Sequence, residues 1–162
     1  MAIITLADNI IVSVDLQAKI EANTLTISDH LLLALASFTA ALYPTAMTYT
    51  ETQQQAVDGP ALFVDYYDIK NSQRLIDTTE FTFGFTITYV PKNQISSYEL
   101  TSAIYLIQQS LGKLESDIGT FSIYDKDSDT TDGLAHVTGT VSVSDITVKT
   151  DPYIITADQI IT

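Results

Sequence analysis

The chain has 162 residues, of which 46% are hydrophobic, and its 20 acidic and 7 basic residues give a formal net charge of −13. This length and composition predict a single folded domain and exclude a disordered chain. The scarcity of basic residues argues against a nucleic-acid-binding protein, and the absence of cysteine excludes disulfides, thiolate chemistry and most structural zinc sites.

The beginning of the chain predicts a soluble intracellular protein. Met1 to Thr5 carries no basic residue ahead of an apolar stretch, so we expect no signal peptide. The longest apolar stretch, Leu31 to Tyr43, is too short to span a bilayer. We expect residues 1–27 to form an N-terminal extension, in which Ile10 to Ala22 fits either a helix or a loosely attached arm.

The first main helix is predicted between Ser28 and Tyr43. Ser28 is a suitable N-cap, Asp29 places negative charge in the first turn, and Pro44 stops the helix. Apolar residues recur at helical spacing and should face the core: Leu31, Leu35, Phe38 and Leu42. Further apolar residues widen this stripe, so we expect the helix to be covered on more than one side, by its own sheet or by a neighbouring subunit.

The residues after Pro44 favour β-structure. We expect strands over Ala46 to Glu51, over Ala61 to Tyr67 and over Thr79 to Val90. The third is the clearest, because large apolar residues alternate with threonine and glycine. One face of that strand carries Phe81, Phe83, Phe85, Ile87 and Tyr89, and the other carries Thr82, Gly84, Thr86 and Thr88.

A second helix is predicted over Tyr98 to Lys113, and two further strands over Thr120 to Lys126 and Ala135 to Val148. Tyr153 to Thr156 could add a short edge strand. The order of helix, two or three strands, helix and hairpin predicts an α+β fold, with an antiparallel β-sheet and two main helices packed on one face. Without internal repeats or a low-complexity linker, residues 28–162 should form one domain.

The aspartate-rich run from Asp125 to Gly133 is the sharpest local feature. Its four candidate metal ligands are Asp125, Asp127, Asp129 and Asp132. A calcium loop of the EF-hand type requires Gly at its sixth position and Glu at its twelfth, where this chain has Thr130 and His136. We therefore favour a polar hairpin loop, and a small divalent-cation-binding domain using residues 125–132 is the alternative.

The sequence offers no catalytic constellation. The two histidines, His30 and His136, stand alone, and nucleophile-elbow and phosphate-loop motifs are missing. Carboxylate pairs such as Glu115 with Asp117 carry no distinguishing signal in so acidic a chain. We therefore expect no catalytic residues, no cofactor and no enzymatic activity.

The hydroxyl-rich strand faces are candidate contact surfaces instead. Such faces suit edge pairing or lateral assembly into a ring, or they are simply solvated. The candidate interface residues are Thr82, Thr86, Thr88, Thr138, Thr140 and Ser142.

Several short stretches together resemble the tail terminator (tail completion) proteins of tailed phages. A helix ends at Tyr43-Pro44, Asp58-Gly59-Pro60 enters an aromatic strand, and a later strand closes at Val90-Pro91. Ser97-Tyr98-Glu99-Leu100 then lies in a helix, and Asp132-Gly133-Leu134-Ala135-His136-Val137 begins a long strand. The resemblance covers about Ser28 to Val148 and leaves residues 1–27 without a counterpart.

The resemblance implies a structural virion protein of the tail or neck, assembled in the host cytoplasm. It implies a ring, expected to be hexameric, that caps the tail tube, stops its polymerisation and meets the head-side connector or stopper protein. DNA would pass through the lumen without specific binding, and carboxylates there would repel it. The alternative is another ring subunit of a neck, a tail tube or a contractile injection system.

Overall fold

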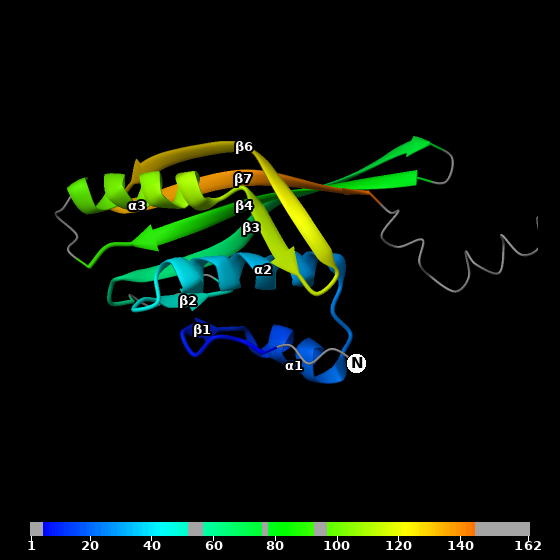
Figure 1. The fold of residues 1–162 in the computed structure, drawn as a ribbon, viewed down its shortest axis with the longest axis horizontal. Coiled ribbons are helices and arrows are strands. Elements are labelled where there is room, and N and C mark those ends of the chain that lie inside the picture. Colours follow the sequence, from blue (N-terminus) through cyan, green and yellow to red (C-terminus); the bar gives the residue numbers. More distant parts are fainter. Residues whose placement is uncertain (1–4, 52–56, 76–77, 93–96, 145–162) are drawn as a thin grey trace, which may run out of the picture.

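The computed structural model describes residues 5–51, 57–75, 78–92 and 97–144. These residues form a curled sheet with three helices (Figure 1). In chain order the elements are β1 (Ile10–Ile11), α1 (Val14–Ala22), α2 (Ile27–Leu42), β2 (Met47–Tyr49), β3 (Ala61–Leu75), β4 (Thr78–Val90), α3 (Ser97–Ser110), β5 (Lys113–Ser116), β6 (Gly119–Thr131) and β7 (Leu134–Ser144).

The seven strands are ordered β1-β2-β3-β4-β7-β6-β5 in the sheet. The β1/β2 and β2/β3 pairs are parallel, and the remaining pairs are antiparallel. The predicted α+β class is therefore confirmed, with a mostly antiparallel sheet. Because the sheet curls, α2 contacts β1, β2 and β3 on one side and β5 on the other, so its wide apolar surface is covered by its own sheet.

The core lies on one face of the sheet, which we call the inner sheet face. The alternation predicted for β4 places Phe83, Phe85 and Ile87 in this core, and Val137 and Val141 of β7 lie opposite them. Side chains of α2 and α3 join the same cluster: Leu31, Ala34, Leu35, Ala36, Ala40, Leu100, Ala103 and Ile107. The opposite face, which we call the outer sheet face, carries the intervening threonines.

The first main helix begins earlier than predicted. Thr26, not Ser28, is its N-cap: the Thr26 hydroxyl accepts a hydrogen bond from the backbone N–H of Asp29, and the Asp29 carboxylate accepts one from the backbone N–H of Thr26. This reciprocal capping box satisfies two N–H groups that a helix end leaves without partners. The other end is as predicted, because α2 stops at Leu42, ahead of Pro44.

The N-terminal segment contributes to the fold. Ile10 and Ile11 form the edge strand β1, and residues 14–22 form α1. The Asn9 amide nitrogen lies 3.2, 3.2 and 2.9 Å from the carbonyl oxygens of Ala40, Tyr43 and Ala46, which fastens this segment to the end of α2. No single helix among the described residues is long and apolar enough to cross a membrane; α1 and α2 reach that length only as a pair bent by 112°.

The second half differs from the prediction at the end of α3. The helix stops at Ser110, and residues 113–116 form β5, a strand that the sequence analysis missed. Lys126 caps this helix end, because its ammonium group donates hydrogen bonds to the carbonyls of Gln108 and Leu111. The structure describes β7 as far as Ser144; the remainder of the strand predicted to Val148 and the short strand predicted over residues 153–156 lie outside the described residues.

Candidate functional site

The six predicted interface residues gather on the outer sheet face. Thr82 lies opposite Ser142 and Thr86 opposite Thr138, while Thr140 lies opposite Gly84. Thr88 lies opposite His136, and its hydroxyl is 3.1 Å from the Nδ1 atom of that histidine. The register thus gathers hydroxyl side chains from two strands into one stripe.

The expected mode of contact for these residues is wrong in one respect. β4 is paired with both β3 and β7, and β7 is paired with both β4 and β6. Both strands therefore lie in the interior of the sheet, where their backbone groups already have partners and cannot pair with another chain. Any contact through this stripe must be made by side chains, with a partner lying flat on the sheet.

Carboxylates border the hydroxyl stripe on both sides. Asp65 and Asp68 of β3 lie opposite Thr86 and Gly84, and Asp127 and Asp129 of β6 lie opposite Thr138 and His136. Lys70 forms an exposed ion pair with Asp68 at 3.4 Å, and the face remains acidic on balance. The outer sheet face is therefore polar and negatively charged, unlike a binding site for phosphate groups.

Most of the aspartate-rich run is strand rather than loop, which corrects the predicted turn. β6 continues to Thr131, and the turn itself is Asp132–Gly133, with φ values of +56° and +76°. Positive φ at both central residues is what a tight type I′ hairpin turn requires, and Asp-Gly is a favoured pair for it. Among the described residues, no three histidine or acidic side chains gather closely enough to hold a metal ion.

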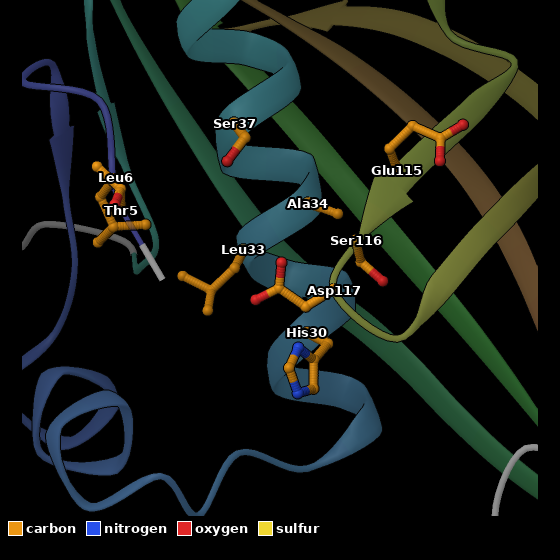
Figure 2. Close-up of a pocket in the computed structure, with 9 residues that line it drawn as sticks. All are labelled: Thr5, Leu6, His30, Leu33, Ala34, Ser37, Glu115, Ser116 and Asp117. Carbon is orange, nitrogen blue, oxygen red and sulfur yellow. The ribbon is translucent and has the colours of Figure 1, made fainter. Parts of the chain in front are cut away.

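A small polar pocket lies between α2, the β5–β6 turn and the N-terminal segment (Figure 2). Its volume is about 130 Å³, and its lining includes His30, Glu115 and Asp117, a grouping that the sequence could not show. In Figure 2 the Asp117 side chain lies towards His30, whereas the Glu115 carboxylate points away and accepts a hydrogen bond from the Thr120 hydroxyl. The Ser116 hydroxyl donates to the carbonyl of Gly119 and accepts from the N–H of Ile118, so it serves the turn. The described residues contain no hydrogen bond from His30 to a hydroxyl, and the pocket therefore lacks a nucleophile paired with a base.

A larger, apolar groove lies at the base of the β3–β4 hairpin, and we call it the hairpin groove. It has a volume of about 420 Å³ and an uncharged lining: Thr26, Ile27, Ser28, Ile69, Phe81 and Phe83. Below it, the Tyr66 hydroxyl donates a hydrogen bond to the carbonyl of Ser28, and burial raises the pKa of Tyr66 well above its usual range. Tyr66 thus stays a neutral donor and fixes the start of α2 against β3.

The exposed side of α3 is also uncharged, and we call it the tyrosine face. It consists of Ser97, Tyr98, Thr101, Ser102, Tyr105, Leu106, Gln109 and Ser110. Tyr98 is 81% exposed and Tyr105 is 66% exposed, which is unusual for large aromatic side chains. The one charged residue of α3, Glu99, is turned away to accept hydrogen bonds from the Tyr89 hydroxyl and the backbone N–H of Lys92.

Two of the short motifs in the sequence meet in space. Gly59 packs directly on the backbone of Pro91 and Lys92, since a Cβ atom at position 59 would lie 2.0 Å from the Pro91 carbonyl oxygen. The chain therefore needs glycine here to let the start of β3 approach the end of β4. Glu99 secures the same corner from the side of α3.

The chain matches a known protein family. A family model described as phage tail terminator protein matches residues 22–153, a range that contains α2, α3 and strands β2 to β7. No curated protein matches the chain.

Proposed function

Since the chain belongs to the phage tail terminator family, we propose that copies of it form a ring, expected to be hexameric, that caps the tail tube. Membership itself makes the protein a structural component of the virion tail that acts in tail completion. The finer part of the proposal is that the ring stops tube polymerisation and joins the tail to the head-side connector or stopper protein. The observation that carries it is the family match over residues 22–153.

The surface chemistry supports a role in binding. The described residues form an uncharged aromatic helix face, an apolar groove and a broad face of hydroxyls and carboxylates. Such surfaces bind proteins by excluding water and matching shape, and they need no reactive group. The small pocket around His30 brings together no nucleophile and base among the described residues.

The outer sheet face is the part of the subunit that we propose to line the ring lumen. It carries Asp65, Asp68, Asp127 and Asp129 around a stripe of hydroxyls. A carboxylate-lined lumen would repel passing DNA, so that DNA would move through without specific binding. The alternative, a side-chain contact between copies through the six hydroxyl residues, predicts that this face is covered in the assembled ring.

The division of the chain is part of the same proposal. Residues 1–27 form an extension and residues 28–162 the tail-terminator domain, and the start of the family match at residue 22 supports a boundary near this point. Because Asn9 binds the end of α2, the extension would travel with its own subunit when the ring assembles.

Native mass spectrometry of the purified protein, with electron microscopy of the same sample, tests the ring. We expect a closed ring of six copies at high protein concentration, and a monomer at every concentration would contradict the proposal. A phage lacking this protein should build tail tubes of uncontrolled length. Tubes of normal length would contradict a role in stopping polymerisation.

A further inference from the structure

Charge limits how copies of this chain can meet. Each copy carries a formal charge of −13, so two copies that approach through acidic surfaces repel one another. A contact through uncharged surface avoids this repulsion. Two such surfaces are large and distinct, namely the tyrosine face of α3 and the hairpin groove.

We propose that the tyrosine face of one copy docks into the hairpin groove of the next copy. This inference rests on the proposed ring and names the surfaces that close it. The occupant of the groove is thus a second copy of this chain.

The two surfaces are chemically complementary. Tyr98 and Tyr105 project from a convex helix, and the groove is concave and lined by Ile69, Phe81 and Phe83. Buried aromatic side chains supply the largest part of many protein contacts, at roughly 150–250 Å² each. A tyrosine hydroxyl can keep a hydrogen-bonding partner at the rim, where the groove has the side chains of Thr26 and Ser28.

The positions of the two surfaces suit a ring. In Figure 1, α3 lies towards one end of the long axis, and the hairpin of β3 and β4 projects from the other end. Different patches on opposite sides of a subunit make a heterologous, head-to-tail contact, and such contacts close into rings when the rotation between subunits allows it. Two copies joined face to face would instead leave one of these patches uncovered.

Thiol cross-linking tests the contact, because the natural chain has no cysteine. The variant carrying Ile69→Cys and Tyr105→Cys is treated with a short bifunctional thiol cross-linker and separated on a denaturing gel. We expect a ladder that ends at the ring size. The matched control, carrying Tyr67→Cys and Tyr105→Cys, should give no ladder, since Tyr67 is comparably exposed (59%, against 54% for Ile69) but lies over Gly84 on the outer sheet face.

Substitutions that introduce a charge test the same contact without a cross-linking reagent. Tyr105→Asp and Ile69→Asp should each weaken self-association about 30-fold or more, as expected for the centre of an interface. Tyr67→Asp should leave it unchanged. All three positions are more than half exposed, so the subunits should fold normally, and circular dichroism verifies this.

The outcomes separate this inference from the proposed function. A wild-type ring with no ladder, or rings that persist in both charged variants, would overturn the contact and leave the ring in place. Rings that form normally in Tyr105→Asp but no longer cap tubes would assign the tyrosine face to the tube protein and overturn the inference. Loss of the ring in Tyr67→Asp would place the contact between copies on the outer sheet face and overturn the inference. A wild-type protein that stays monomeric at all concentrations would overturn both proposals.

Discussion

The two faces of β4 and β7 differ although they share the same backbone. On the inner sheet face, Phe85, Ile87, Val137 and Val141 are fully buried beneath the helices. On the outer sheet face, hydroxyl side chains alternate with them and remain partly accessible. Burial requires apolar residues on the inner face. Folding would tolerate many polar residues on the outer face, so the hydroxyl and carboxylate residues found there can be ones that assembly requires.

Of the substitutions considered, Phe85→Ala on the inner sheet face should destabilise the fold most. Phe85 is fully buried at the centre of the core, and removing its ring leaves a cavity between the sheet and the helices. We expect the free energy of unfolding to fall by about 3–5 kcal/mol. Urea denaturation at a fixed protein concentration measures this, and a loss below about 1 kcal/mol would show that the inner face is not the core.

Gly139 and Gly84 allow a glycine-to-alanine substitution to be compared on the inner and outer sheet faces. A Cβ atom at Gly139 would lie 2.7 Å from the buried ring of Phe85, whereas one at Gly84 would meet the far end of the exposed Tyr67 side chain. Gly139→Ala should therefore destabilise the fold by roughly 1–3 kcal/mol, because Phe85 cannot move away. Gly84→Ala should have a much smaller effect, since Tyr67 can rotate.

Thermal and urea unfolding of both variants check this comparison. Gly112→Ala is the matched control for the substitution itself, because nothing lies within 4 Å of a Cβ atom there. Equal losses at positions 84 and 139 would contradict the difference between the faces.

Asp29→Asn changes the capping box of α2, the helix that covers the inner sheet face. Partial burial raises the pKa of Asp29, but hydrogen bonds from the backbone and hydroxyl of Thr26 and from Lys19 outweigh it, and the net pKa lies below its ordinary value of 3.8. The stabilisation by this carboxylate is therefore complete above that value and is lost as the pH falls through the lower folded pKa. We expect the variant to lose about 1 kcal/mol at neutral pH and to match the wild type in strong acid.

Unfolding curves collected across this pH range provide the measurement. Asp129→Asn is the control on the outer sheet face, where an exposed aspartate should contribute less than about 0.5 kcal/mol. A difference at position 29 that stays constant down to strong acid would contradict the role of the capping box.

Thr86→Val should have the smallest effect on folding. Thr86 lies on the outer sheet face, and valine keeps its shape while removing the hydroxyl, so we expect a change within about 0.5 kcal/mol. The reverse exchange on the inner face, Val137→Thr, buries a hydroxyl and should destabilise the fold by about 1–3 kcal/mol. Chemical denaturation of both variants compares them, and a larger loss for Thr86→Val would invert the assignment of the two faces.

The sequence predicted the fold best where its periodicity was strong. Alternation in β4 identified both of its faces, and the spacing of Leu31 and Leu35 identified the buried side of α2. Prediction failed where the deciding contact is distant in sequence. Lys126 caps α3 from β6, and β5 is held by its pairing with β6, so the local sequence around Gly112 placed the helix end only approximately and missed the strand that follows.

The candidate surfaces were predictable only in part. The hydroxyl residues were identified from alternation, but their place in the interior of the sheet depends on which strands pair. The aspartates from Asp125 to Asp129 were predicted as a loop because aspartate favours turns, yet β6 passes an irregularity between Tyr124 and Asp127 and then pairs Asp127 and Asp129 with β7. The hairpin groove joins the start of α2 to the hairpin, and no stretch of sequence contains both.

The sequence alone determined the charge, the inner and outer alternation of β4, the stop of α2 ahead of Pro44 and the family motifs. Each of these depends on neighbouring residues along the chain, so a local reading is sufficient. The tertiary structure alone decided which strands lie in the interior, how closely Gly59 approaches Pro91, and that α3 and the β3–β4 hairpin lie towards opposite ends. Those features depend on strand order and packing, because residues far apart in the chain must be brought together before either surface exists.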